Sequence, residues 1–192
     1  MNSDSALKFK FYYLQNMPDV NAKIREIRQE ILRFFNTTED NHCVIFTSGT
    51  TQGLKIVVEN FDFETQNGTF LYLDECHTSV VGLRELVENY EIFNVFNFDR
   101  KLSNQNGLVT FPAMSNFNGQ KFPMKKWIKK CHESNYKVLL DAASFISTNP
   151  LDLQDIEADF VTISFYKIFG YPTGLGALVV KNSSLKYLKY NF

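Results

Sequence analysis

The sequence predicts an α/β fold in which a mostly parallel β-sheet is sandwiched by helices. Short apolar, β-rich runs alternate along the chain with turn residues and with helical patterns. This alternation is typical of a parallel sheet covered on both faces, because two neighbouring parallel strands are usually connected by a helix that packs on one face of the sheet. The chain has 192 residues, and a single domain commonly has about 100–200, so one domain is expected.

Several runs are expected to form strands. Each is rich in β-branched, aromatic or aliphatic residues and is followed by turn chemistry. They span residues 43–46, 70–73, 92–96, 108–111, 137–140, 160–163 and 175–180.

Two helices are predicted from the spacing of apolar residues. Apolar residues after Pro18 recur at intervals of four and three, which predicts a helix that packs against the domain by this stripe. A second helix is expected over residues 52–59, directly after a Thr-Ser-Gly-Thr-Thr turn. The stripe of the first helix consists of Val20, Ile24, Ile27, Ile31 and Phe34.

A lysine-rich segment at residues 124–131 has two interpretations. Its lysines and its tryptophan are compatible with a nucleic-acid patch, but its apolar residues have the i, i+3, i+4, i+7 spacing of a helix face that packs on a core. The chain has 20 basic and 21 acidic residues, and this balance disfavours nucleic acid as a partner. The core-facing stripe consists of Met124, Trp127, Ile128 and Cys131.

Composition argues against several other classes of protein. The uncharged, apolar-rich stretches at 107–120 and 168–180 are shorter than the roughly 18 apolar residues of a membrane-spanning helix, so no membrane span is expected. The first residues lack the features of a secretory signal, and a cytoplasmic location is expected. Three cysteines at wide spacing favour reduced thiols over a disulfide framework or a zinc site, and no metal site is predicted.

Polar clusters follow five of the predicted strands. In parallel sheets, ligands bind outside the carboxyl ends of the strands, so these clusters are expected to converge on one edge. They occupy residues 47–51, 74–77, 112–116, 141–144 and 164–167.

Positions in three of these clusters have both a structural and a chemical interpretation. The turn that leads into Thr50 and Thr51 is either an ordinary helix cap or an anion site, where free N–H groups and hydroxyls meet a phosphate. Asp141 ends a buried strand and either caps a turn or meets a cation. Lys167 lies among aromatic and aliphatic residues, and it either lays its stem on apolar surface or presents an amine for Schiff-base chemistry.

Two further candidates are adjacent in the sequence. His77 begins a possible helix and is either a satisfied side chain or a site residue. Cys76 beside it suggests a Cys–His pair, but adjacent residues on a strand-to-helix turn diverge, so a catalytic Cys76 is not favoured.

A possible anion site, an aspartate at the end of a strand and a lysine after a later strand are together the groups that a pyridoxal-phosphate site requires. Such a site anchors the phosphate, keeps the ring nitrogen protonated and holds the aldehyde as an imine. The segments TSGTT, HTSVVGLRE, FPAMSNFNGQ, LLDAASFISTNPLDL and ADFVTISFYKIFGYPTGLGALVVKN resemble the amino-terminal, NifS-like domain of molybdenum cofactor sulfurases, in the class V aminotransferase superfamily. The resemblance runs from about Ile24 to Asn182 and implies part of the large domain of a fold type I pyridoxal-phosphate enzyme.

The resemblance implies a role for each matching position. Lys167 forms the Schiff base, Asp141 pairs with the pyridinium nitrogen and His77 stacks on the ring. The other cofactor-binding residues are Thr50, Ser164 and Tyr166 at the phosphate, Asn116 and Ser144 near the ring hydroxyl, and Thr51.

The resemblance also implies an activity and partners. Sulfur is taken from L-cysteine through an enzyme persulfide, alanine is released, and the sulfur passes to the molybdenum cofactor. Enzymes of this fold usually complete their sites in a dimer, so a homodimer is expected.

The sequence departs from the family in one respect that bears on activity. The family's nucleophilic cysteine and substrate-binding arginine lie beyond the lysine motif, and this chain ends 25 positions after Lys167. None of Cys43, Cys76 and Cys131 matches the nucleophile.

We therefore expect a single incomplete class V aminotransferase-like domain over residues 1–192. Two functions stay open: the cofactor-binding part of a sulfurase, or an inactive remnant that binds pyridoxal phosphate or only keeps the fold. The expected parts are a divergent segment at 1–19, a family-like core at 20–182 and a tail at 183–192.

Overall fold

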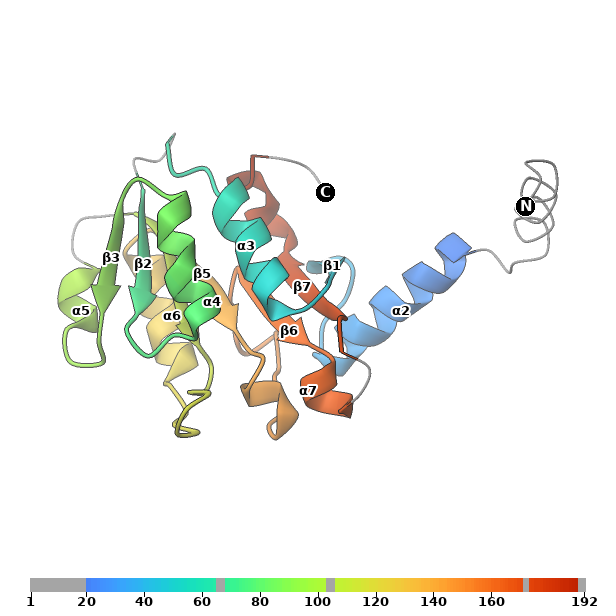
Figure 1. The fold of residues 1–192 in the computed structure, drawn as a ribbon. Coiled ribbons are helices and arrows are strands. Elements are labelled where there is room, and N and C mark those ends of the chain that lie inside the picture. The colour runs from blue at the N-terminus through green and yellow to red at the C-terminus, as the bar shows by residue number, and fades with distance from the viewer. Residues whose placement is uncertain (1–19, 65–67, 103–105, 171–172, 190–192) are drawn as a thin grey trace, which may run out of the picture.

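A seven-stranded β-sheet forms the centre of the molecule (Figure 1). The computed structural model describes residues 20–64, 68–102, 106–170 and 173–189, so the segment predicted as divergent, 1–19, lies outside the described residues. The strands are β1 (His42–Thr47), β2 (Thr69–Leu73), β3 (Tyr90–Phe93), β4 (Gly107–Pro112), β5 (Tyr136–Asp141), β6 (Phe160–Ser164) and β7 (Gly176–Lys181).

The sheet is mostly parallel, as the sequence predicts. Its strand order is β1-β7-β6-β5-β4-β2-β3. All neighbours from β3 to β6 pair in parallel, whereas β7 is antiparallel to both β6 and β1. Every strand except β7 therefore runs in one direction, and the carboxyl ends of these strands share one edge.

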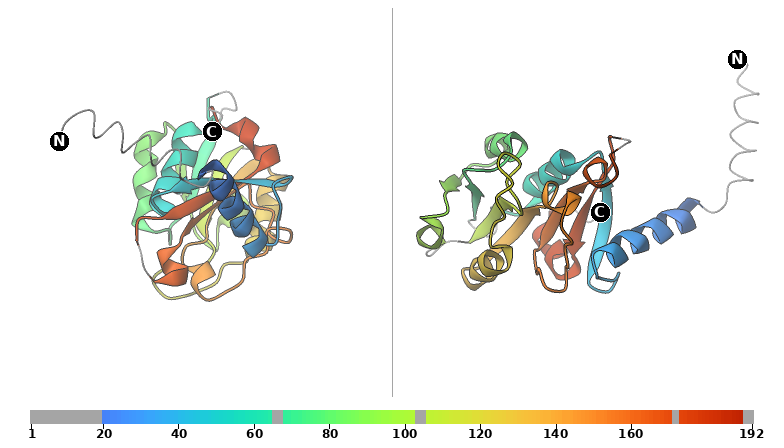
Figure 2. Two further views of the ribbon diagram at one scale, coloured as in Figure 1. Left: turned by 90° about the vertical axis from the view of Figure 1, so that its right-hand side faces the viewer. Right: turned by 90° about the horizontal axis from the view of Figure 1, so that it is seen from below.

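Helices cover both faces of the sheet (Figures 1 and 2). On one face lie α3 (Thr50–Asn60), α4 (Thr78–Val81) and the 3₁₀ helix η1 (Gly82–Leu86). On the other lie α5 (Phe98–Lys101), α6 (Met124–Glu133), the 3₁₀ helix η2 (Phe145–Ser147) and the end of α2 (Val20–Phe34). The remaining elements are the short α7 (Tyr166–Phe169) and the 3₁₀ helix η3 (Asn182–Tyr187).

Strand alternation produces two hydrophobic cores, one on each face. In β5, Val138 and Leu140 belong to the core under α6, whereas Leu139 between them belongs to the core under α3. All three are fully buried, and burial of an aliphatic side chain of this size stabilises a fold by roughly 1.5–3 kcal/mol. The central strands are therefore fixed in register by both cores.

Two of the predicted helices are confirmed. The segment predicted at 52–59 lies within α3, and its Leu54, Val57 and Val58 are buried. Trp127, Ile128 and Cys131 of α6 are buried too, so the apolar stripe of the lysine-rich segment packs on the core.

The predicted packing of the first helix is wrong for most of its stripe. The helix is present as α2, but of the predicted stripe only Ile31 is buried. Val20 is 50% exposed, Ile27 42% and Phe34 60%. The reason is visible in Figure 1, where α2 leaves the body and runs beyond the end of the sheet, so that its first turns have no described element to pack against.

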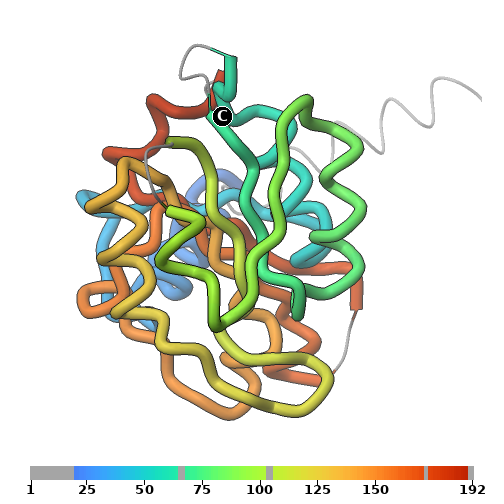
Figure 3. The backbone as a smooth tube through the Cα atoms, turned by 90° about the vertical axis from the view of Figure 1, so that its left-hand side faces the viewer, coloured from blue at the N-terminus to red at the C-terminus, as the bar shows by residue number. Residues whose placement is uncertain are grey.

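Two predicted strand boundaries also change. The run at 92–96 contributes only its beginning to β3, and Phe96 is 96% exposed. The chain turns there because the Asn94 side chain accepts hydrogen bonds from the Phe96 and Asn97 amides, at 3.0 and 3.1 Å. Figure 3 views the molecule from this edge. The run predicted at 175–180 begins one residue too early, because Leu175 lies outside β7 and is 51% exposed.

In the described part of the chain, no helix combines the length and the apolar character needed to cross a membrane.

Candidate functional site

A pocket of about 190 Å³ opens at the carboxyl edge of the sheet. Every site residue predicted from the sequence lines it, although these residues come from five separate segments. They are Thr50, Thr51, His77, Asn116, Asp141, Ser144, Ser164, Tyr166 and Lys167.

One end of the pocket is formed by the beginning of α3. Gly49 precedes the helix with φ of 146°, a conformation that favours glycine. The Thr50 amide donates a hydrogen bond of 2.9 Å to Ser164 Oγ, and the two hydroxyl oxygens are also 2.9 Å apart. Hydroxyls beside the positive end of an 11-residue helix make this end of the pocket suitable for an anion.

Asp141 lies at the floor of the pocket, where β5 ends. Asp141 is 7% exposed, and its carboxylate accepts a hydrogen bond of 3.0 Å from the Ala143 amide. Burial raises the pKa of the Asp141 carboxyl, while the hydrogen bond from the Ala143 amide and the charge of Lys167 act in the opposite direction. A buried carboxylate with so little compensation suits a cationic N–H group in the pocket.

Lys167 presents its amine to two polar side chains. Its Nζ donates hydrogen bonds to Asn116 Oδ1 at 3.0 Å and to Ser144 Oγ at 3.3 Å. Ser144 Oγ in turn donates to Asn116 Oδ1 at 3.0 Å. The three side chains form a closed triangle, so the amine is directed into the pocket rather than along the apolar surface.

His77 is held by the turn that begins α4. Its Nδ1 accepts a hydrogen bond of 3.1 Å from the Ser79 amide, and Ser79 Oγ lies 2.9 Å from the same nitrogen. The ring therefore has a fixed orientation at the rim of the pocket.

The cysteines do not form a Cys–His pair with His77. Cys76 donates a long sulfur hydrogen bond of 3.7 Å to the carbonyl of Thr110. Burial raises the pKa of the Cys76 thiol well above its ordinary value, and the nearby Asp141 charge adds to this effect. Burial also raises the pKa of Cys43 and Cys131. All three thiols are therefore poor nucleophiles in this structure.

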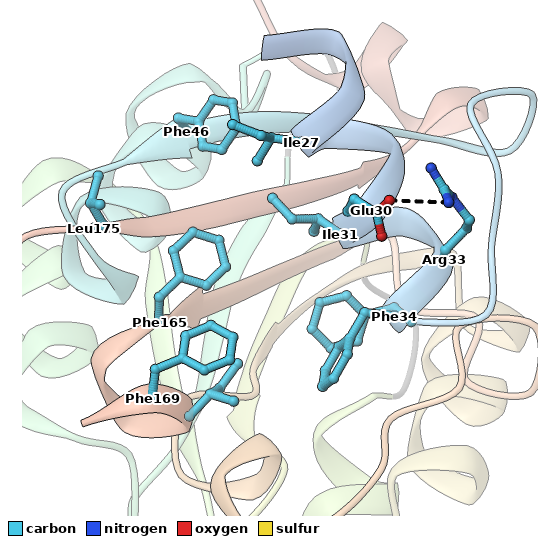
Figure 4. A pocket seen from close by; sticks show the side chains of 11 residues that line it. Ile27, Glu30, Ile31, Arg33, Phe34, Phe46, Phe165, Phe169 and Leu175 are labelled. Carbon is cyan, nitrogen blue, oxygen red and sulfur yellow. Dashed lines mark ion pairs between the residues drawn. The ribbon is translucent and has the colours of Figure 1, made fainter. Parts of the chain in front are cut away.

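A larger groove of about 710 Å³ lies beside the pocket, between α2 and the Lys167 segment (Figure 4). Its charged residues, Glu30 and Arg33, pair with each other at 3.1 Å. The groove lacks the polar side chains that chemistry at a cofactor requires, so the smaller pocket is the candidate site. The groove is lined mainly by Ile27, Ile31, Phe34, Phe35, Phe46, Phe165, Ile168, Phe169 and Leu175.

Sequence reasoning missed two polar residues that line the pocket, Gln52 and Ser79. Gln52 accepts a hydrogen bond of 2.6 Å from the Ser48 amide and so closes the turn before α3. Gln52 could have been found from its position four residues after Ser48, at the start of the predicted helix. Ser79 could have been found from its position two residues after His77, which begins a possible helix.

A family model described as "Aminotransferase class-V" matches residues 15–190, which is most of the chain. The chain belongs to the class V aminotransferase family. A molybdenum cofactor sulfurase of Bombyx mori is 43% identical over 212 residues, which cover 91% of this chain and 26% of that protein. The chain thus spans about a quarter of the length of the curated relatives it matches.

Solved structures share the fold of this chain. The cystine C–S lyase C-DES in complex with its product cysteine persulfide superimposes with a TM-score of 0.80 at 22% identity, covering 98% of this chain and 56% of the lyase. A C-DES variant with glycine linked to its pyridoxal-phosphate cofactor gives a TM-score of 0.79 at 21% identity, covering 98% and 55%. The sheet and its helices therefore have the architecture of a fold type I large domain.

Proposed function

We propose that this chain carries the cofactor-binding part of a pyridoxal-phosphate-dependent enzyme that transfers sulfur from L-cysteine to the molybdenum cofactor. The observation that carries the proposal is the convergence of Lys167, Asp141 and the Thr50–Ser164 pair on one pocket. The family membership, the relatives named as molybdenum cofactor sulfurases and the pyridoxal phosphate of C-DES support the same reading.

The donor set of the pocket fits pyridoxal phosphate. Asp141 is a buried carboxylate that lacks a cationic partner among the described residues, and a protonated ring nitrogen would supply one. The amide of Thr50 and the hydroxyls of Thr50 and Ser164 would hold the phosphate, with Thr51 and Tyr166 beside them. Lys167 Nζ is the amine that would bind the aldehyde carbon.

When bound, the cofactor supplies a sink for the electrons released at the α-carbon of an amino acid. The chain's own residues set the conditions for this chemistry. Asp141 would hold the proton on the ring nitrogen, because separating that pair would leave an uncompensated buried charge. Asn116 and Ser144 keep Lys167 Nζ at a defined place, which lowers the entropy lost when it reacts.

The location and assembly of the protein are also proposals. Free cysteines throughout the described chain support a cytoplasmic location. The exposed side chains of Phe34 and Phe169 in the apolar groove support a homodimer, because soluble monomers rarely leave such patches uncovered.

The decisive experiment measures cofactor binding. Pyridoxal phosphate added to the purified chain should produce a visible absorption band that survives gel filtration. Lys167→Ala should abolish the band, whereas Lys129→Ala, a change of an exposed lysine on α6, should leave it intact. A band that is absent, or that persists in Lys167→Ala, would contradict the proposal.

A second measurement separates the sulfurase from the alternative, an inactive remnant that binds the cofactor or only keeps the fold. The alternative is favoured by the raised pKa of all three thiols, which leaves no activated nucleophile among the described cysteines. Alanine release from L-cysteine by the loaded chain would support the enzyme, and a stable Lys167-dependent band without alanine release would support the remnant.

A further inference from the structure

The hydrogen bonds at His77 determine which of its ring nitrogens carries the proton. The Ser79 amide points its N–H at Nδ1, with a nitrogen-to-nitrogen distance of 3.1 Å. An amide N–H can only donate, so Nδ1 must present its lone pair. A neutral imidazole has one protonated nitrogen, and in His77 this is therefore Nε2.

The Ser79 side chain supports the same assignment. Its Oγ lies 2.9 Å from Nδ1, and a nitrogen that already accepts from an amide cannot also donate to a hydroxyl. Ser79 Oγ–H therefore also donates to Nδ1. Two donors converge on the Nδ1 lone pair, while Nε2 makes no hydrogen bond to the described residues. Because His77 lines the pocket and its Nδ1 side faces the α4 turn, Nε2–H is the group available to a ligand.

We propose that Ser79 and the first turn of α4 hold His77 as the Nε2–H tautomer, so that His77 is a hydrogen-bond donor in the pocket and not its proton acceptor. If Nδ1 accepted a proton, it would lose the hydrogen bond from the Ser79 amide, and the bond with the Ser79 hydroxyl would have to reverse its direction. Ser79 is thus a positioning residue that acts through His77. The ligand that receives the hydrogen bond rests on the proposed function, whereas the tautomer does not.

The tautomer can be measured without any cofactor. In the chain labelled with ¹⁵N at histidine, two-bond proton–nitrogen correlation at pH 8 distinguishes a protonated from an unprotonated ring nitrogen, and the His77 signals are those missing in His77→Gln. We expect an unprotonated Nδ1 and a protonated Nε2. A protonated Nδ1 would overturn the proposal.

Variants of the α4 turn test the positioning role. Ser79→Ala removes one neutral hydrogen bond and should raise the ratio of Nδ1–H to Nε2–H tautomer roughly two- to tenfold, while the Ser79→Thr variant keeps the hydroxyl and should restore the wild-type ratio. Thr78→Ala changes a hydroxyl on the same turn that makes no hydrogen bond to the His77 ring, and it should have no effect. Equal ratios in Ser79→Ala and Thr78→Ala would show that the Ser79 hydroxyl does not position the ring.

The donor role is tested with the loaded chain. His77→Gln offers an N–H group at about the reach of Nε2 but no ring nitrogen, whereas His77→Leu offers neither. We expect the dissociation constant for pyridoxal phosphate to rise roughly two- to tenfold more in His77→Leu than in His77→Gln. An equal rise would remove the donor role. If no variant binds the cofactor, the proposed function fails. The tautomer measurement then still decides whether the α4 turn holds His77 as the Nε2–H tautomer.

Discussion

The Thr50 amide hydrogen-bonds to Ser164 Oγ across 2.9 Å, although the two residues are 114 positions apart in the chain. This contact joins the first turn of α3 to the end of β6. It brings the helix beginning and the Lys167 segment to one pocket, and it places the serine hydroxyl where a bound anion would meet both.

Replacing Ser164 tests the anion end of the pocket. Ser164→Ala should weaken binding of pyridoxal phosphate roughly tenfold to hundredfold, because a hydrogen bond to a charged group contributes about 1.5–3 kcal/mol. Titration of the visible band measures the dissociation constant. Ser134→Ala, a serine at the end of α6, is the control. Unchanged binding in Ser164→Ala with an intact circular dichroism spectrum would exclude Ser164 from the phosphate site.

Gly176 allows two backbones to approach each other under the same pocket. A Cβ atom at Gly176 would collide with the carbonyl oxygen of Ile163 and would lie 2.6 Å from Gly49 Cα. Gly176→Ala should therefore lower the free energy of unfolding by about 1–3 kcal/mol, as measured by urea denaturation. Gly82→Ala is a matched control, since a Cβ there meets nothing within 4 Å. Equal stability of the two variants would contradict the close approach.

Asp159 connects stability to pH at the opposite edge of the sheet. Its carboxylate accepts hydrogen bonds from Ser184 Oγ at 2.6 Å, from His132 Nε2 at 2.8 Å and from the Val138 amide at 2.8 Å. Burial alone raises the pKa of Asp159, but these hydrogen bonds, first among them the one from His132, hold the pKa below its ordinary value. The carboxylate form is therefore favoured more in the folded than in the unfolded chain.

The sign of the pH effect follows from this lowered pKa. The stabilisation is complete above the unfolded value of about 3.9, and it is lost as the pH falls from there through the folded pKa. Asp159→Asn should cost roughly 1.5–3 kcal/mol at pH 7 and should flatten the fall of unfolding free energy below pH 4. Asp155→Asn, which breaks an exposed ion pair with Lys125, should cost little at pH 7. An unchanged acid limb in Asp159→Asn would be inconsistent with the contact geometry.

The apolar groove predicts self-association. Phe34 is 60% exposed and Phe169 is 70% exposed on its two sides. Sedimentation velocity should therefore detect association that increases with concentration, and Phe34→Ser combined with Phe169→Ser should weaken it. Phe96→Ser, which changes an even more exposed ring at the β3 edge, should not. A monomer at every concentration would count against a dimer through this groove.

The sequence by itself determined the alternation of strands and helices, the core-facing stripes of α3 and α6, and the strand-end segments that meet at the pocket, although not Gln52 and Ser79 within its lining. These follow from local rules, because side-chain periodicity depends only on the element and because parallel strands bring their carboxyl ends to one edge. Only the tertiary structure decided that α2 leaves most of its apolar stripe uncovered, since burial depends on what lies opposite a helix. The orientation of His77 likewise required the Ser79 contact in three dimensions, because a residue type does not reveal which ring nitrogen faces a donor.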